Sequence, residues 1–457
     1  MKRWLPWFVL PLIAIILVIA GHSTQESLLQ DSDTKVLLEN IRERQDPAAW
    51  FAGDWPLYNH FYRPVSTLAF EMDNAIHYTN AAGFGLTNAL IAALCISLCF
   101  WMLRELSNRP WLAGLGSGLF GLWHIKGPVN EWIQFVLAVL AGLCLLGFLR
   151  RDHAPARQIL SAVFVLLFAS AVFRVAGGEF ADRIVHWLPG RTASVMTIFT
   201  LASVAAYARY ERISAARKPM QEAKANDVPA TKGTEVSKVG KWTWLWLVWA
   251  FIDLVLALMS YEQAVMLPAI LLGTAILFSQ TGRRPNWWVH AGFWAVLGSY
   301  LVMRARILPS EVSGYQAQQF RDGIGVYFSI GDYGFPLINW VQQFLTSMSA
   351  GILVLMTLSP WALLSFIIGN VVAHVQTWKS HDRWLMIAML LMSLISFLPM
   401  AWLKYFGHYL YWPSAFWAVY CVLLVALGGK LAINAVSPRA IPAPPRSDPA
   451  PGSLPHR

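Results

Sequence analysis

Long apolar stretches alternate with short polar segments along most of the 457-residue chain. A membrane-spanning helix needs about 17 to 25 mostly apolar residues, because no water inside a bilayer satisfies bare backbone groups. The pattern predicts roughly twelve such helices, at about residues 4–20, 83–103, 110–124, 131–149, 158–176, 191–209, 242–259, 264–280, 288–304, 349–377, 384–401 and 413–430. We therefore expect an all-α polytopic membrane protein.

Four longer polar segments separate or follow these helices. Residues 21–82 form a first outer loop, and residues 306–348 form a second outer segment. Residues 210–241 are polar with no apolar period, which is typical of a disordered cytoplasmic linker. This linker divides the membrane region into an N-terminal half, residues 1–209, and a C-terminal half, residues 242–430. Residues 431–457 are rich in Pro and are expected to form a disordered cytoplasmic tail.

The first outer loop is too long for a simple connection, and two stretches in it have helical spacing. The stretch "TKVLLENIRE" has its apolar residues on one side, and "PVSTLAFEMDNAIHY" begins at a Pro and places Leu68, Met72 and Ile76 about one turn apart. Two interpretations stay open. Both helices lie on the membrane surface with an apolar face in the lipid, or both pack on the helical bundle.

Composition and charge placement fit a membrane protein. The chain is 56% hydrophobic and 13% charged, with a mean hydropathy of +0.48, which is more apolar and less charged than a soluble domain. The net charge of +10 comes from Lys and Arg that cluster in alternate loops, as the positive-inside rule requires of cytoplasmic segments. Nucleic-acid binding is disfavoured, because the positive charge is not gathered on one soluble domain.

The cysteines and the N-terminus add little chemistry. Cys95, Cys99, Cys144 and Cys421 fall within predicted spans, so no two are placed in an aqueous loop for a disulfide or a metal site. The basic start and apolar core of Met1–Ala20 also fit a signal peptide. We interpret this segment as the first spanning helix.

Residues with chemical capacity gather at the outer ends of the predicted spans. Polar groups at membrane depth are costly, so such a set favours a functional site. The alternative is that these side chains merely solvate helix ends. The set comprises Asp31, Asp33, Asp54, His60, Arg63, His124, Asn130, Glu131, His186, Arg191, Glu262, Lys404 and His408.

Glu262 is the sharpest case, because "LALMSYEQAVMLPAILL" leaves it almost no aqueous loop. It must face a polar cavity, be protonated, or pair with a residue such as Arg63, Arg191 or His408; otherwise it only closes a tight turn. Arginine binds phosphate oxygens with a planar fork, and a carboxylate accepts a hydroxyl proton as that oxygen attacks a sugar. Acids and arginines on one face therefore suit glycosyl transfer from a lipid phosphate.

Six stretches occur in an order that resembles the membrane half of the GT-C superfamily of glycosyltransferases. They are "QDSDTKVLLEN", "YNHFYRPVSTLAF", "LFGLWHIKGPVNEWI", "HWLPGRTASVM", "SYEQAVMLPAILL" and "GHYLYWPSAFW". The resemblance runs from about residue 25 to 430 and is greatest to the transmembrane-and-tetratricopeptide O-mannosyltransferases and their bacterial relatives. It implies a GT-C-like fold with a large catalytic first outer loop.

The resemblance also implies roles for individual residues. Asp33 fits the second acid of the family's pair, whereas Ser32 stands in the place of the first and Asp31 lies one position earlier. Either Asp31 or Asp33 would be the general base. Arg63, Arg191 and His408 would hold the donor phosphate, and the remaining substrate-binding positions would be Tyr62, His124, Glu131, Glu262 and Tyr411.

Besides Ser32, three positions depart from the family's pattern. Ile125 stands where Pro is usual, Tyr261 replaces a Lys, and His408 replaces an Arg. A histidine carries no permanent charge, so a phosphate contact at that position would depend on pH. A catalytically degenerate relative with an assembly role is therefore one alternative function.

The expected function is transfer of a hexose or pentose from a polyprenyl-phosphate donor to an acceptor hydroxyl at the outer face of a bacterial inner membrane. The other alternative is a transporter or flippase for a lipid-linked or anionic solute, for which Asp253 within a predicted span would be essential. An acidic pair is able to hold a divalent cation, so the sequence leaves a metal requirement open. It specifies neither the sugar, the acceptor nor the oligomeric state.

Overall fold

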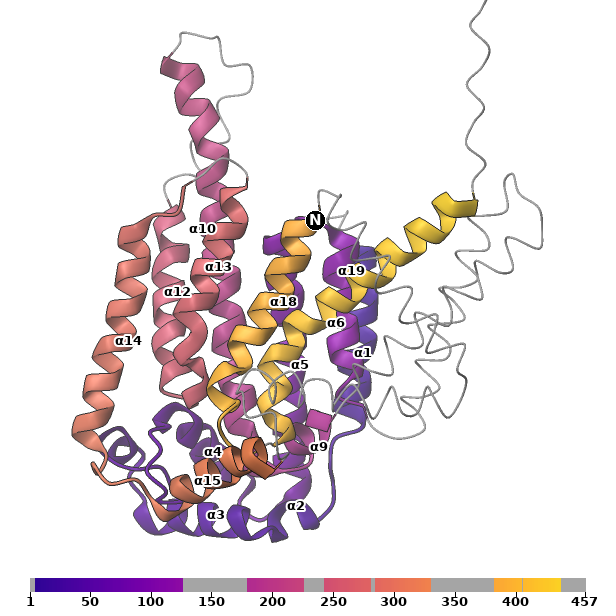
Figure 1. The fold of residues 1–457 in the computed structure, drawn as a ribbon. Coiled ribbons are helices and arrows are strands. Elements are labelled where there is room, and N and C mark those ends of the chain that lie inside the picture. The colour runs from indigo at the N-terminus through magenta and orange to yellow at the C-terminus, as the bar shows by residue number, and fades with distance from the viewer. Residues whose placement is uncertain are drawn as a thin grey trace, which may run out of the picture.

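A computed structural model describes residues 5–125, 179–225, 242–280, 284–329, 382–404 and 406–436. All regular elements in these ranges are helices (Figure 1). The long helices that stand side by side are α1 (Val9–Ala20), α5 (Ala81–Ser107), α6 (Pro110–Leu122), α10 (Arg191–Ala225), α12 (Thr243–Leu258), α13 (Leu267–Ser279), α14 (Trp287–Ile307), α18 (Arg383–Phe397) and α19 (Tyr411–Val436).

Each predicted span that falls within the described residues coincides with one of these helices. By length and composition, three segments are able to cross a membrane: Ala81–Ser107, Glu262–Ser279 and Arg383–Met400. Leu5–Ala20 and Thr243–Leu258 are shorter apolar helices. The described part of the chain is thus all-helical with candidate membrane spans. The predicted spans at 131–149, 158–176 and 349–377 lie outside the described residues, and the total of twelve stays a prediction.

Local sequence sets the ends and the close packing of these helices. Asn80 caps the start of α5 by accepting a hydrogen bond from the backbone N–H of Gly83, and Asn108 ends the helix in the left-handed conformation. The small residue Gly114 lets α6 approach the N-terminal segment, because a Cβ there would lie 2.2 Å from the carbonyl oxygen of Trp7. Such small residues commonly allow membrane helices to touch.

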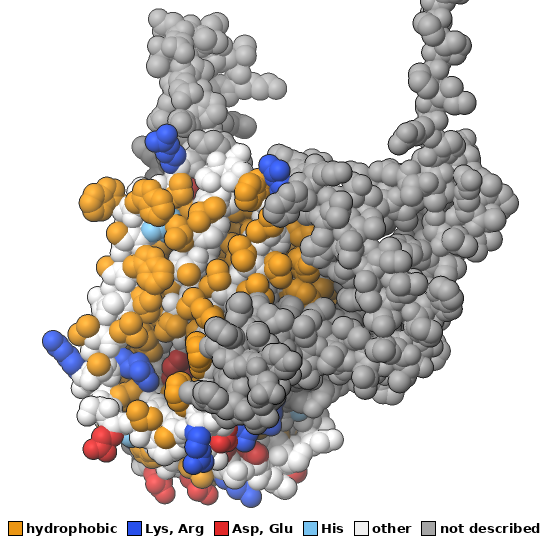
Figure 2. All heavy atoms as spheres, viewed as in Figure 1, with side chains coloured by type: hydrophobic (Ala, Val, Ile, Leu, Met, Phe, Trp, Pro, Cys, Tyr) orange, Lys and Arg blue, Asp and Glu red, His pale blue; other side chains and the backbone are white. Residues whose placement is uncertain are grey.

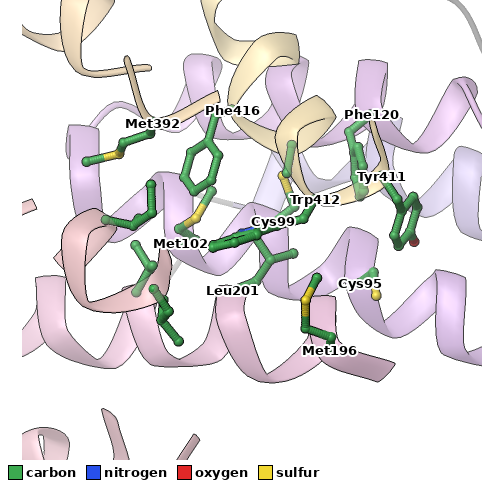
Figure 3. Close-up of a cluster of buried hydrophobic side chains, with 14 of the residues drawn as sticks. Cys95, Cys99, Met102, Phe120, Met196, Leu201, Met392, Tyr411, Trp412 and Phe416 are labelled. Atoms are coloured by element: carbon green, nitrogen blue, oxygen red, sulfur yellow. The ribbon is translucent and has the colours of Figure 1, made fainter. Parts of the chain in front are cut away.

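The core of the bundle is apolar and sulfur-rich. Figure 3 shows Cys95, Cys99 and Met102 of α5 facing aromatic side chains of α19. The three thiols in the described residues are free and buried, and their helices coincide with predicted spans.

Two helices extend further than predicted. Residues 210–225, expected to be disordered, continue α10, and residues 431–436 continue α19 beyond its expected end at 430. In α10 the physical reason is composition, because Ala, Arg, Lys and Glu dominate this stretch and all favour helix. Arg209 and Arg212, around the start of this stretch, also hold α10 to α5 because they bind Glu105.

The first outer loop folds against one end of the bundle, the lower end in Figure 1. It contains α2 (Ser27–Gln30), α3 (Ser32–Arg44), the short helix η2 (Pro47–Ala52) and α4 (Pro64–His77). The helix α15 (Gly314–Ser329) lies at the same end (Figure 1). Both helical stretches predicted in the first loop are therefore confirmed as α3 and α4.

The helices α3 and α4 of this loop orient their apolar faces differently. Leu37, Leu38 and Ile41 of α3 are buried against a cluster that includes Trp50 and Trp55, so α3 packs on the protein. In α4 the apolar stripe predicted from the sequence instead points outward. Met72 and Ile76 are 65% and 70% exposed, whereas Ser66, Thr67 and Asp73 of the same helix are buried.

The surface shows the polarity expected of a membrane protein. In Figure 2, hydrophobic side chains cover the visible flank of the bundle. Most of the acidic side chains visible in this view gather at the lower end, where the first outer loop lies.

Candidate functional site

A cavity of about 990 Å³ lies where the first outer loop meets the end of the bundle. It is built by α3, the segment before α4, the turn after α9 (Glu179–Val185), the short helix η4 (Glu262–Met266), α15 and the segment around η6 (Gly407–Leu410). Among the described residues, its charged lining consists of Asp33, Glu262, Arg63, Arg183, Arg304 and Arg321. Positive charge therefore exceeds negative charge in this part of the lining, which suits an anionic ligand.

The two candidate base residues have different surroundings. Asp31 caps α3 by accepting the backbone N–H of Thr34, and it also accepts a hydrogen bond of 3.0 Å from the indole N–H of Trp187. Asp33 lies in the first turn of α3 and lines the cavity. Partial burial and the neighbouring Asp31 raise the pKa of Asp33, while Arg183 acts in the opposite direction. Asp33 is therefore the acid of the pair that lines the cavity, whereas Asp31 holds the start of α3 to Trp187.

Arg63 and Glu262 form an ion pair in the wall of the cavity. The Nη2 atom of Arg63 donates to Oε2 of Glu262 at 2.6 Å, and Nε donates to the same oxygen at 2.9 Å. The guanidinium lies 4.2 to 4.5 Å from the rings of Phe61, Trp55 and Tyr261. The sequence-based pairing of Glu262 with Arg63 is confirmed.

This pairing sets the charge state of Arg63. Burial lowers the pKa of the guanidinium, but the Glu262 carboxylate, together with Tyr261 and Tyr409, raises it, so the pKa lies above its ordinary value. Its positive charge is already matched by a carboxylate. The pair therefore offers a ligand much less attraction than an unpaired arginine would.

Arg183 is a cavity cation that the sequence analysis did not select. It comes from α9, and its guanidinium carbon lies 4.9 Å from the ring centroid of Trp187 and 5.8 Å from that of Phe406. A Cβ at Gly190 would lie 1.6 Å from the carbonyl oxygen of Arg183, so only glycine permits this turn to fold back on α9. In the sequence, Arg183 and Trp187 are four residues apart in "RIVHW", and this spacing was the available signal that their side chains lie close together.

His408 lines the same cavity as a neutral side chain. Its ring lies between those of Trp187 and Phe406, at 5.5 and 5.7 Å between centroids. Its Nε2 atom is 3.2 Å from the hydroxyl of Tyr261. Burial, together with Arg63 and Arg183, lowers the pKa of His408 to about 3. Tyr261 and His408, two of the positions that depart from the pattern of the resembled family, are therefore hydrogen-bonded to each other.

The helix α15 closes one side of the cavity and is anchored to the first outer loop. Gln316 donates to the carbonyl of His60 at 2.8 Å, and Arg304 donates to the same carbonyl at 3.3 Å. Asp54 holds this carbonyl in place by accepting the backbone N–H groups of His60 and Phe61. Arg304 keeps its Nε atom buried without a hydrogen-bond partner within the described residues.

The other predicted substrate-binding residues lie away from the cavity. Arg191 is fully buried and pairs with Asp73 at 2.6 Å. His124 and Tyr411 are buried and bind each other at 2.8 Å, and Tyr62 donates its hydroxyl to the carbonyl of Phe51. These four residues hold helices and loops together. Glu131 lies outside the described residues.

The described residues do not assemble a metal centre of the usual kind. No group of three His, Cys, Asp or Glu side chains in them is arranged to hold an ion. Of the described carboxylates near Asp33, Glu262 also lines the cavity but is paired with Arg63, and Asp31 binds Trp187 and the backbone of α3.

Comparison of the chain with protein-family models, curated proteins and solved structures gives no match. The resemblance to GT-C glycosyltransferases therefore stays a prediction, and the function has to be argued from the cavity itself.

Proposed function

We propose that the chain is a GT-C-like membrane glycosyltransferase of twelve spans, with its cavity at the outer face of a bacterial inner membrane. It takes a hexose or pentose from a polyprenyl-phosphate donor and gives it to an acceptor hydroxyl. The observation that carries the proposal is the position of Asp33 in a cavity that also contains Arg183, Arg304 and a wall of aromatic rings. A base, an anion site and an apolar surface are the three features that this reaction needs.

Asp33 is the base in this scheme. The acceptor oxygen forms a bond to the anomeric carbon, and its proton passes to the Asp33 carboxylate. The bond between the anomeric carbon and the phosphate oxygen breaks, and the polyprenyl phosphate leaves with the electron pair. A raised pKa makes a carboxylate a stronger base, and the pKa of Asp33 is raised by burial and by Asp31.

Arg183 and Arg304 are the cations that bind the departing phosphate. Within the described residues, neither is ion-paired as Arg63 is with Glu262. Arginine binds phosphate oxygens with a planar fork, and such contacts strengthen as the leaving phosphate gains charge. Arg63 and Glu262 have a different role in the proposal, since they join the loop before α4 to η4 and shape the wall.

The remaining lining suits a lipid-linked sugar. Trp187, Phe406 and Tyr409 present rings to the cavity, and Met400, Leu403 and Phe320 add apolar surface beside them. Aromatic faces pack well against the C–H faces of a sugar ring, and the apolar side chains accommodate the first isoprene units of a carrier. A soluble donor, such as a nucleotide sugar, would gain little from this apolar part of the lining.

The test uses two neighbouring acids as a matched pair. Asp33→Asn removes the base and is expected to lower transfer at least about a hundredfold, the lower end of a general base's contribution. Asp31→Asn keeps an amide oxygen that caps α3 almost as well, so activity should persist. The measurement is mass spectrometry of lipid-linked sugars and envelope glycans in cells that carry the native gene, a deletion or either variant.

The expected result is accumulation of a polyprenyl-phosphate monosaccharide, with loss of one glycan sugar, in the deletion and Asp33→Asn strains alone. Normal glycans in the Asp33→Asn strain, at normal protein level, would contradict the transferase proposal. Transport or an assembly role would then be the better account.

Transport has one observation in its favour. Asp253 of α12 is 5% exposed, and its Oδ2 atom has no hydrogen-bond partner in the described residues. A proton-coupled carrier would depend on such an acid in a span. In the transferase proposal Asp253 is dispensable, so Asp253→Asn distinguishes the two functions in the same glycan assay.

A further inference from the structure

Three arginines converge on one buried carboxylate at the end of the bundle opposite the cavity. Glu105, in the last turn of α5, is fully buried. It lies 2.6 Å from Arg104, 3.1 Å from Arg212 and 3.4 Å from Arg209. One guanidinium is enough to neutralise a carboxylate. Three guanidiniums therefore exceed what the charge of Glu105 requires.

Among the described residues of this cluster, guanidiniums outnumber carboxylates. The buried Glu211 adds a second carboxylate on α10, which gives three guanidiniums to two carboxylates in this described set. Burial lowers the pKa of Arg212, and the like charges of Arg209 and Arg104 lower it further, while Glu105 acts in the opposite direction. The side chains of Arg104 and Arg209 are each 36% exposed. An anion from outside the chain is thus able to reach this cluster and would relieve the repulsion within it.

Tryptophan side chains adjoin the arginines. The guanidinium carbon of Arg209 lies 5.9 Å from the ring centroid of Trp246, and Trp246 stacks on Trp249 at 5.9 Å. Trp101 packs against both rings. Trp242 and Trp244, at the same end of α12, are more than half exposed. Tryptophan gathers where a membrane meets water, so these rings mark the headgroup level of one leaflet.

An exposed apolar face continues from these rings along α12. Leu245, Val248, Ile252 and Val255 are between 39% and 53% exposed and follow each other at helical spacing. A ligand that fills both regions must carry a negative headgroup and long apolar chains. Soluble phosphate would occupy the arginines and leave the apolar face uncovered.

We propose that Arg104, Arg209 and Arg212, together with the tryptophans of α12, bind the headgroup of an anionic phospholipid in the leaflet opposite the cavity. The phosphate contacts the exposed guanidiniums, the headgroup packs beside Trp246 and Trp249, and the acyl chains follow the apolar face of α12. This inference does not depend on the glycosyltransferase proposal, because Glu105 lies in the last turn of α5, at the end of the bundle opposite to α3 and α15, which line the cavity (Figure 1).

The experiment measures lipid binding to the purified full-length protein by native mass spectrometry. Phosphatidylglycerol and phosphatidylcholine with identical acyl chains are titrated separately into delipidated protein in detergent. We expect tighter binding of phosphatidylglycerol, with a preference that weakens as salt is raised. Equal binding of the two lipids would overturn the proposal, and so would displacement of phosphatidylglycerol by equimolar inorganic phosphate.

Two arginine variants test the location of the site. Arg104→Gln combined with Arg209→Gln keeps Arg212 as the partner of Glu105 and should reduce the phosphatidylglycerol preference at least roughly tenfold, given a contribution of about fivefold for each basic residue near a membrane surface. The matched control, Lys35→Gln combined with Arg306→Gln, removes two charges at the cavity end and should leave the preference unchanged. An unchanged preference in the arginine variant would contradict the assignment.

A third variant keeps the test decisive if the arginine variant folds poorly. Glu105→Gln removes the carboxylate that neutralises the cluster, so its phosphatidylglycerol preference should rise above that of the native protein. A lower preference in Glu105→Gln would mean that the arginines only stabilise Glu105, and the lipid site would be rejected.

Discussion

At the scale of single residues, side chains that are close together in the sequence have different positions relative to the cavity. Asp31 and Asp33 are two positions apart, yet one caps a helix and the other faces the cavity. The reason is the start of α3, since Asp31 is its N-cap, with an extended backbone and a side chain turned back to the N–H of Thr34, whereas Asp33 lies within the first helical turn. Proximity along the chain therefore does not assign the base, and the direction of each side chain does.

The pH dependence of transfer follows from the surroundings of Asp33. The base must be ionised, so activity falls as the pH drops through the Asp33 pKa, which burial and the charge of Asp31 raise. Asp31→Asn removes that neighbouring charge and should therefore lower the pKa and move the acid limb of the rate profile to lower pH. Arg183→Gln removes the opposing cation, so it should move the limb to higher pH.

The measurement is the pH profile of transfer by the native protein and both variants in the same detergent. Identical acid limbs in all three proteins would mean that a group other than Asp33 controls the reaction.

A contact is predictable from the sequence where a residue has few available partners. Glu262 had almost no aqueous loop, so a pairing with arginine followed from the cost of a buried charge, and Arg63 is that partner. Arg191 could not be assigned in the same way, because its partner Asp73 lies within an apparently ordinary loop helix. The sequence alone does not reveal that α4 turns this carboxylate toward α10.

At the scale of elements, α4 shows why a period alone does not fix orientation. The spacing of Leu68, Met72 and Ile76 correctly indicates a helix with an apolar stripe, but this stripe is outward and the opposite face, with Ser66 and Asp73, is buried. A soluble protein would bury the stripe. An outward stripe is what a helix beside lipid requires, so the surface-helix interpretation holds better for α4 than for α3.

Removal of one partner from the buried ion pair between α4 and α10 should strongly destabilise the protein. Asp73 and Arg191 are 3% and 0% exposed, and Arg191 also donates to Asn88 and to the carbonyl of Phe84. Asp73→Ala leaves a buried guanidinium without its anion, which costs about 3 to 5 kcal/mol. We expect a lower unfolding temperature in detergent and a lower yield of folded protein.

A surface pair provides the control for this prediction. Asp322→Ala removes a carboxylate that is 3.7 Å from the exposed Lys404 side chain, and exposed pairs contribute only about 0 to 1 kcal/mol. Equal unfolding temperatures for Asp73→Ala and Asp322→Ala would contradict the prediction. They would mean that water reaches the Asp73–Arg191 pair far more than the burial of these two side chains implies.

At the scale of the whole molecule, the two ends of the bundle differ in chemistry. The cavity and the outer-loop helices occupy one end, and the cluster around Glu105 with its tryptophans occupies the other (Figure 1). Hydrophobic side chains cover the flank between them (Figure 2). The sequence predicts this division because apolar length and the distribution of Lys and Arg are properties of the chain itself. It does not predict the cavity, since Asp33, Arg183 and His408 meet only after folding.

The chemical difference between the two ends of the bundle predicts how the protein is oriented in the membrane. Basic residues favour the cytoplasmic side, so the end with Arg104 and Arg209 should face the cytoplasm and the cavity should face outward. Single cysteines are placed at two exposed positions, Tyr58 near the cavity and Trp242 near the arginines, in a variant whose four native cysteines are replaced by Ala. In intact spheroplasts a membrane-impermeant maleimide should label the cysteine at 58, and it should label the cysteine at 242 only after permeabilisation. The opposite pattern would put the cavity in the cytoplasm, where a donor on the outer leaflet does not reach Asp33.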